Sequence, residues 1–315
     1  MRAIQFSEYG PPSVMQVAEV AEPHAGPGEI RIAVRASGIS PGEMKLRSGM
    51  MRDALPMPLP YRTGFDAAGV VDEVGDGVTG TGVGDEVFGV ASMIGRGANA
   101  DHVVLAAWAP KPPAWSWEEA GGAAGSVETS VRVLDRLAVG PGHTVLVQGA
   151  AGAVGTVAVQ FAVARGAKVI GTASEHNHEF LRSLGAEPTT YGAGLVERVR
   201  ALAPGGVEAV FDCAGGALPD LIAIAGDKAR VVTIADLGAA VHGVHLSHSA
   251  PVDVDASDLG GADPMALHGL GLAVELAGQG RLRVPIAAAF PLSEVAAAHE
   301  LSETRHARGR IVLVH

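Results

Sequence analysis

Cysteine is almost absent from the 315-residue chain, in which Cys213 is the only one. A single thiol cannot form an intramolecular disulfide, and a zinc site built from several cysteines is excluded. Clusters of Lys and Arg are also missing, and the formal net charge is -11. The chain therefore lacks the basic surface that attracts nucleic acids and anionic membranes, and we expect no nucleic-acid partner.

Long uninterrupted apolar runs are missing as well. Glycine or proline interrupts each candidate for the 18-residue apolar span that a membrane helix needs. The first residues, Met-Arg-Ala-Ile-Gln-Phe, lack the apolar core of a signal peptide. We expect a cytoplasmic protein without a membrane partner, long enough for two domains.

Residues 144–172 have the order strand, glycine-rich turn, apolar helix and second strand, which is typical of a βαβ dinucleotide-binding unit. A pyrophosphate docks on free backbone N–H groups at the helix start, and a side chain at Gly152 would keep it away from them. Gly155 lets the helix pack closely on the strand. The alternative is a tight turn that binds nothing. The predicted cradle consists of Gly149, Ala150, Gly152, Ala153, Val154 and Gly155.

The predicted secondary structure of the chain changes near Ser116. Before it, short β-rich runs are separated by Gly and Pro, which indicates a partly open barrel. Ser116 and Glu119 form a capping-box pattern that begins a helix, and strands then alternate with helices as in a doubly wound parallel sheet. A strand over 282–286, a helix over 292–304 and a strand over 310–314 return the chain to the first domain. We predict one domain over 1–119 and 282–315, and a nucleotide-binding domain over 120–281.

The end of the second strand favours NADP over NAD. An NAD enzyme usually has Asp or Glu there to hold the ribose, but this chain has Ala173. Ser174 is a candidate ligand for a 2′-phosphate, with His176 behind it, although Ser174 is also suited to cap the next helix. Cys213 and Ala214 follow a later strand, where cofactors lie in open sheets, and we interpret Cys213 as a packing residue because no basic partner is apparent.

Three histidines, His242, His245 and His248, invite a metal hypothesis. In an extended segment His242 and His248 share one face and His245 lies on the other. We therefore predict no metal site.

Five stretches carry a family likeness: SGISPGE (37–43), TGFDAAG (63–69), GDEVFG (84–89), GAAGAVG (149–155) and GRIVL (309–313). In this order they resemble the zinc-independent quinone oxidoreductase branch of the medium-chain dehydrogenases and reductases. The resemblance implies an α/β protein with a GroES-like β-barrel catalytic domain, a Rossmann domain with a doubly wound parallel sheet, and a homodimer.

The resemblance also assigns roles to single residues. Zinc-dependent relatives have a metal-binding cysteine where this chain has Ser40 and a histidine where it has Phe65, so we expect no catalytic zinc. Quinone reductases often carry asparagine at Ser40 and tyrosine at Lys45. Ser40 and Thr129 match positions near the nicotinamide, and helix capping is the alternative role for their hydroxyls. Tyr191 matches a position near the adenosine phosphate, or else is a buried structural residue.

These features predict a zinc-independent, NADPH-dependent reductase that passes a hydride to a quinone or an activated alkene, either an enone or an alkenal. We expect the proton of the reduced product to come from solvent, and Tyr61, in the proline-rich stretch 47–63, is the alternative donor. Asp66 is expected to orient its loop. The competing hypothesis is a non-catalytic NADP(H)-binding redox sensor or interaction protein.

Overall fold

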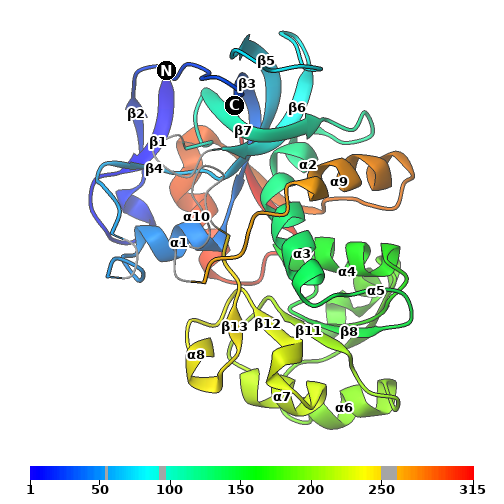
Figure 1. The fold of residues 1–315 in the computed structure, drawn as a ribbon. Coiled ribbons are helices and arrows are strands. Elements are labelled where there is room, and N and C mark those ends of the chain that lie inside the picture. Colours follow the sequence, from blue (N-terminus) through cyan, green and yellow to red (C-terminus); the bar gives the residue numbers. More distant parts are fainter. Residues whose placement is uncertain (54–55, 92–96, 250–260) are drawn as a thin grey trace. The chain divides into compact units, whose positions relative to one another are not determined.

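The computed structural model describes residues 1–53, 56–91, 97–249 and 261–315, which form two compact units (Figure 1). Unit 1 contains residues 1–125 and 267–315, and unit 2 contains residues 126–249 and 261–266. The predicted boundaries were 119/120 and 281/282. The second boundary differs because α9 (His268–Gly278) contacts β7 (His102–Pro110) in unit 1.

Unit 1 is organised around β3 (Ile30–Ile39), which pairs with three other strands. β3 pairs antiparallel with both β5 (Asp66–Val74) and β7, so that β3, β5, β6 and β7 close into a barrel. On its other side β3 pairs with β15 (Arg310–Val314), with Ile39 opposite Ile311. In Figure 1 this last strand, drawn in red, joins strands drawn in blue. The chain end therefore completes the sheet that the N-terminal region begins.

The remaining elements of unit 1 surround this sheet. A three-stranded sheet has the order β2-β1-β4, and an apolar cluster joins it to α1 and α10. The strand expected over 282–286 is found later, at β14, because Pro285 has no N–H for a ladder hydrogen bond. The bounds are β1 (Arg2–Phe6), η1 (Pro12–Val14), β2 (Gln16–Glu19), α1 (Pro41–Arg47), β4 (Tyr61–Arg62), β6 (Glu86–Ala91), α2 (Trp117–Gly121), β14 (Ile286–Pro291), η5 (Leu292–Glu294) and α10 (Val295–Glu303).

Unit 2 contains a six-stranded, fully parallel sheet in the order β10-β9-β8-β11-β12-β13. Numbered from β8, this is the order 3-2-1-4-5-6 of a Rossmann fold, which confirms the predicted fold class. Its bounds are β8 (Thr144–Gln148), α4 (Ala153–Ala164), β9 (Lys168–Thr172), η2 (Glu175–Asn177), α5 (His178–Ser183), β10 (Ala186–Thr189), α6 (Leu195–Leu202), β11 (Ala209–Asp212), α7 (Leu218–Ala225), η3 (Lys228–Arg230), β12 (Val231–Thr233), α8 (Ala239–His242) and β13 (His245–Leu246).

Local chemistry sets several ends of these elements. Ser116 and Glu119 form the predicted capping box: the Glu119 N–H donates to the Ser116 hydroxyl at 3.2 Å, and the Ser116 N–H donates to the Glu119 carboxylate at 2.9 Å. Gly166 follows α4 with a φ of +81°, as expected of a helix-ending glycine. The helix α3 (Ala124–Arg136) begins five residues before Thr129. Thr129 therefore lies inside α3 and caps nothing.

Candidate functional site

The glycine turn lies at the carboxyl end of β8, where ligands bind in open α/β sheets. The Gly149 N–H donates to the Thr172 hydroxyl at 2.9 Å, and that hydroxyl donates to the Gln148 side chain at 2.7 Å. The Ala150 N–H donates to the Thr172 carbonyl at 3.0 Å. These bonds hold the turn against the end of β9, so the start of α4 has a fixed position.

Gly152 and Gly155 are glycines for different reasons. A methyl group at Gly155 would overlap the Gly149 carbonyl oxygen and lie 2.8 Å from the Ala150 Cα, so the fold itself excludes a side chain. A methyl group at Gly152 would meet only the Gly149 carbonyl oxygen, at 3.3 Å, and the backbone φ there is an ordinary -79°. Gly152 is the N-cap of α4 and offers no side-chain cap to the first N–H groups. The open space beside them fits an anion.

The end of β11 completes this edge of the sheet. A methyl group at Gly149 would lie 3.1 Å from the Ala214 Cβ, so the turns after β8 and β11 are adjacent, and Cys213 lies between Asp212 and Ala214. The Asp212 carboxylate accepts from the Ala214 and Gly215 N–H groups at 3.0 and 2.9 Å. Burial, and then the neighbouring Asp212, raise the pKa of the Cys213 thiol well above its usual value. A neutral thiol is a poor nucleophile, which fits the packing role expected of Cys213.

The hydroxyls of Ser174 and Tyr191 meet beyond the end of β9, 3.2 Å apart. Ser174 is at the N-cap position of η2, but its side chain makes no capping bond. Tyr191 is 56% exposed, so the alternative of a buried structural tyrosine is wrong. His176 is exposed, and its Nε2 lies 3.2 Å from the Asn177 amide nitrogen. The structure thus brings Ser174 and Tyr191 together at the position where an NAD enzyme would have an acid.

Arg198 of α6 supports this corner and was missed from the sequence. Its guanidinium donates to the carbonyls of Thr190 at 2.9 Å and Ala193 at 2.7 Å, with a longer contact of 3.4 Å to the Tyr191 carbonyl. These bonds fix the loop that presents the Tyr191 hydroxyl. Only the tertiary structure reveals this role, because an isolated arginine in an amphipathic helix resembles a solvated residue.

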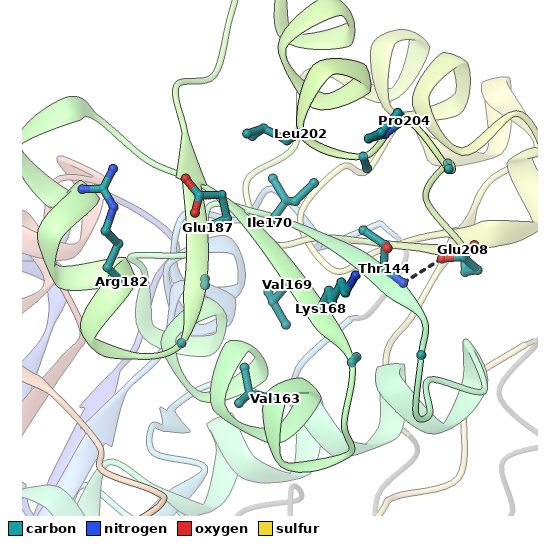
Figure 2. Close-up of a pocket in the computed structure, with 17 residues that line it drawn as sticks. Thr144, Val163, Lys168, Val169, Ile170, Arg182, Glu187, Leu202, Pro204 and Glu208 are labelled. Atoms are coloured by element: carbon teal, nitrogen blue, oxygen red, sulfur yellow. Dashed lines mark hydrogen bonds between the residues drawn. The ribbon is translucent and has the colours of Figure 1, made fainter.

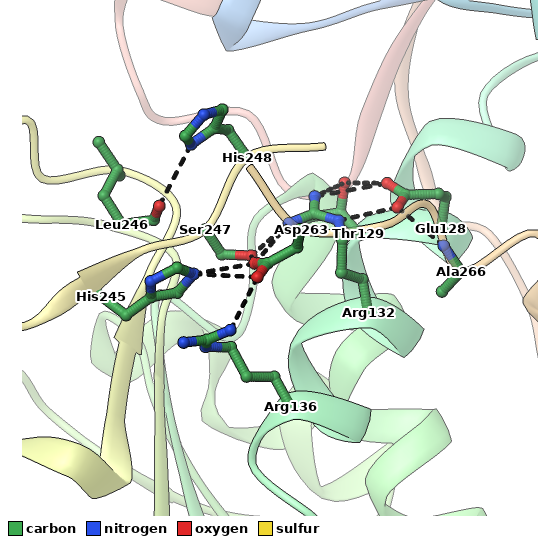
Figure 3. A network of polar contacts seen from close by, with 10 residues as sticks. All are labelled: Glu128, Thr129, Arg132, Arg136, His245, Leu246, Ser247, His248, Asp263 and Ala266. Carbon is green, nitrogen blue, oxygen red and sulfur yellow. Dashed lines mark hydrogen bonds and ion pairs between the residues drawn. The ribbon is translucent and has the colours of Figure 1, made fainter. Parts of the chain in front are cut away.

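A buried polar network surrounds Thr129 (Figure 3). The Arg132 guanidinium lies between Glu128 and Thr129 on one side and Ser247 and Asp263 on the other. The sequence drew attention to Thr129 but not to these neighbours. Glu128 and Arg132 form an (i, i+4) pair, a signal visible in the sequence, whereas the participation of Asp263 depends on the fold.

Ser40 and its neighbours lie in unit 1. Ser40 is the N-cap of α1, where its hydroxyl accepts from the Gly42 N–H at 3.1 Å, so the capping alternative holds for this residue. Glu43 is buried and accepts from the N–H groups of Ser40 at 2.8 Å and Gly64 at 2.5 Å and from the Asn99 amide at 3.3 Å. Burial raises the pKa of Glu43 to about 7, and the nearby Asp66 adds to this shift.

Asp66 pairs with Arg310 inside unit 1, with 2.9 Å between the Arg310 Nη2 and each carboxylate oxygen. The Gly125 N–H also donates to Asp66, at 2.9 Å. Asp66 therefore binds β15 and the start of α3 to β5, which is a structural role as expected.

Tyr61 is less exposed than its place in a proline-rich stretch suggested. It lies in β4, is buried, and packs against the Phe6 ring with 5.5 Å between ring centroids. Burial, with a smaller contribution from Glu43, raises the pKa of the phenol to about 12. A buried phenol of such low acidity is poorly suited to give up a proton. Residues 54–55 of the same stretch lie outside the described part of the chain.

A hollow lies elsewhere, at the amino ends of the strands of unit 2 (Figure 2). It has a volume of about 830 Å³ and is bordered by the strand starts Thr144, Lys168 and Ala186. Its charged residues are mixed in sign, for example Arg182 and Glu187. Since the glycine turn follows the carboxyl end of β8, this hollow is separate from the turn.

The three histidines are not arranged as expected. His242 ends the short helix α8, and Gly243 follows it in the left-handed region with a φ of +66°, so the segment is not continuously extended. His245 lies in β13 with its Nε2 2.9 Å from Asp263, and His248 lies 3.3 Å from the Leu246 carbonyl. Within the described residues, no three His, Cys, Asp or Glu side chains gather as metal ligands. None of the helices described there is long and apolar enough to cross a membrane.

A two-domain oxidoreductase scaffold is the class that this fold and glycine turn define. Two family models match the chain: an alcohol dehydrogenase GroES-like domain over residues 26–135 and a zinc-binding dehydrogenase domain over residues 184–313. The chain belongs to the medium-chain dehydrogenase and reductase superfamily, with quinone oxidoreductases among its relatives.

Individual relatives agree with this placement. A quinone oxidoreductase of Rattus norvegicus is 35% identical over 193 residues, which cover 59% of this chain and 57% of that protein. The Escherichia coli quinone oxidoreductase solved with NADPH superposes with a TM-score of 0.81 at 25% identity, covering 100% of both chains. A structure described as an NAD-dependent alcohol dehydrogenase has a TM-score of 0.83 at 29% identity, again covering 100% of both. The matches span about half the length of several curated relatives.

Proposed function

We propose that the chain is an NADPH-dependent oxidoreductase that transfers a hydride to a quinone or an activated alkene, an enone or alkenal, without a catalytic zinc. The glycine turn is the observation that carries this proposal. Packing within the protein accounts for Gly155 but not for Gly152, whose missing side chain leaves the first N–H groups of α4 accessible. A pyrophosphate is the ligand that best fits this opening.

Residues around the turn would bind the other parts of the cofactor. Ser174 and Tyr191 would bind a 2′-phosphate through their adjacent hydroxyls, with His176 as a further candidate, and Cys213 with Ala214 would form the wall beside the turn. Thr129 would bind the carboxamide. A nicotinamide cofactor supplies the hydride when it is bound. We assign the proton of the reduced product to solvent, because Tyr61 is buried and weakly acidic.

Two side chains support the absence of a zinc step. The Ser40 hydroxyl is engaged in capping α1, and Phe65 has no atom that can ligate a metal. Elemental analysis of the purified protein tests this point, and stoichiometric zinc that is needed for turnover would overturn it.

The test of function is to mix the protein with NADPH and a panel of quinones, enones and alkenals and to follow oxidation of the nicotinamide. We expect turnover with at least one class, and faster turnover with NADPH than with NADH. NADPH binding without turnover across the panel would instead support the NADP(H)-binding sensor or interaction protein, which the buried position of Tyr61 favours. We further propose a homodimer, on the strength of the family resemblance, and sedimentation analysis tests it.

A further inference from the structure

The function proposed above leaves the charges around Thr129 without a role. The side chains of Arg132 and Glu128 are 5% and 4% exposed, and their Nε–Oε1 distance is 2.8 Å. Burying two charges costs stability unless many hydrogen bonds compensate, and a well-packed apolar pair would serve the fold equally well. The contacts of Glu128 and Arg132 therefore indicate a role for these charges other than folding.

The direction of the hydrogen bonds provides such a reason. Arginine can only donate, and its Nη2 lies 3.5 Å from the Thr129 hydroxyl oxygen. The same hydroxyl donates its single proton to Glu128 Oε2, at 3.3 Å. One lone pair of the hydroxyl thus faces Arg132 and the proton faces Glu128. The lone pair that remains makes Thr129 an acceptor toward any third group.

Further contacts prevent the guanidinium from turning away. Arg132 Nη1 donates to the Ser247 hydroxyl, and Ser247 donates to Asp263 at 2.5 Å. Asp263 also lies 2.8 Å from the Arg136 Nη1 and 2.9 Å from the His245 Nε2. On the other side, Glu128 Oε1 accepts from the Ala266 N–H at 3.2 Å. The network fixes both neighbours of the Thr129 hydroxyl.

The helix that carries Thr129 contacts the start of α4. The next residue, Ser130, donates its hydroxyl to the carbonyl of Val154 at 3.3 Å, and Val154 is in the first turn of α4. Thr129 itself is half-buried, unlike the buried Glu128 and Ser130 on either side of it.

From this arrangement we propose that Glu128 and Arg132 are positioning residues that present Thr129 to the cofactor as a hydrogen-bond acceptor. The site then selects a ring substituent with an N–H donor, the carboxamide, over one that offers only a carbonyl oxygen. This inference rests on the proposed function, since it requires a nicotinamide cofactor at the turn.

Calorimetric titrations with NADP⁺ and its 3-acetylpyridine analogue test the proposal, because a methyl ketone replaces the carboxamide in the analogue. We expect the wild type to bind NADP⁺ about tenfold more tightly than the analogue, the effect of one unmatched hydrogen bond. In the double variant Glu128→Leu/Arg132→Met the Thr129 hydroxyl can rotate and donate to the ketone, so the preference should fall to about twofold or less. Thr129→Val should remove the preference as well, and it leaves the ion pair intact.

Arg165→Met is the matched control, because Arg165 pairs with Asp135 of α3 at 2.7 Å, outside the network drawn in Figure 3. It should keep the tenfold preference. A merely structural network would lower both affinities together and leave their ratio unchanged. The proposal is overturned if the wild type binds the two compounds equally, or if Thr129→Val or a folded double variant retains the preference. Failure of the wild type to bind either compound would instead overturn the proposed function.

Discussion

At the scale of single residues, Gly152 and Gly155 separate the demands of the fold from those of a ligand. We predict that Gly152→Ala lowers the melting temperature much less than Gly155→Ala does, since the new methyl group meets only one backbone oxygen, at 3.3 Å. The same methyl group stands in front of the first N–H groups of α4, so the affinity for NADPH should fall by about tenfold or more. Thermal unfolding and fluorescence titration of NADPH measure the two effects.

Two further alanine variants make this comparison specific. Gly155→Ala should destabilise unit 2 by about 1–3 kcal/mol, because its methyl group overlaps the backbone of the turn. Gly205 lies in the loop after α6, and a methyl group there would have no atom within 4 Å. Gly205→Ala should therefore change neither the melting temperature nor the affinity for NADPH. If Gly152→Ala bound NADPH as tightly as Gly205→Ala, the turn would not be a phosphate site.

Ser174 tests the choice between NADP and NAD. Removing its hydroxyl with Ser174→Ala deletes one hydrogen bond to a charged 2′-phosphate, which contributes about 1.5–3 kcal/mol. The affinity for NADPH should therefore fall by about tenfold or more, while that for NADH stays the same, as measured by titration of each cofactor. An equal loss for both cofactors would show that Ser174 supports the loop and does not recognise the phosphate.

At the scale of elements, the ion pair Asp66–Arg310 connects β5 and β15, which begin at these two residues. Both side chains are at most 3% exposed. Asp66→Asn leaves the Arg310 charge buried without a countercharge, and we expect unit 1 to lose about 3–5 kcal/mol of stability in urea unfolding.

The control for this pair is Asp53→Asn, which removes an ion pair with Arg52 whose side chains are 96% and 65% exposed. No measurable change is expected there, because solvent screens such a pair. A similar small effect at Asp66 would mean that water reaches Arg310.

The elements themselves were largely predictable where a local signal exists. The glycine turn, the capping box at Ser116 and the closing strand β15 follow from patterns a few residues long, and all three are present. The start of α3 could not be predicted, because the alanine and glycine at its first positions carry no capping signal. The network around Arg132 and the support of Tyr191 by Arg198 could not be predicted, since their partners come together only through tertiary packing.

At the scale of the whole molecule, buried titratable groups in unit 1 make its stability depend on pH. Two histidines and one carboxyl act in opposite directions. His299 is fully buried, and neither ring nitrogen has a partner among the described residues. Burial, and then the nearby Arg47, lower the pKa of His299 from 6.5 to about 4. The folded state thus binds fewer protons than the unfolded state between these values, and stability falls as the pH drops from 6.5 to 4. Burial lowers the pKa of His315 to about 4 as well, with the same sign.

Glu43 acts in the other direction. Its pKa rises from 4.5 to about 7, so the folded state holds the extra proton, and stability is lost as the pH rises through this range. Each group shifts the free energy of unfolding by about 3 kcal/mol over its window, at about 1.4 kcal/mol per pKa unit. The effects of His299 and Glu43 offset each other where their pH windows overlap, while that of His315 remains, so single variants are needed to separate them.

We therefore predict that His299→Leu removes the part of the acid-induced loss of stability that His299 causes, because leucine cannot bind a proton. Relative to the wild type, the variant should gain up to about 3 kcal/mol between pH 6.5 and 4, measured by urea unfolding at several pH values. Glu43→Gln should produce its gain between pH 4.5 and 7, since an amide does not ionise and its oxygen still accepts from the Gly64 N–H. The exposed Glu179→Gln serves as the control and should parallel the wild type throughout. A His299→Leu curve parallel to that of the wild type would mean that His299 finds a hydrogen-bond partner when it is protonated.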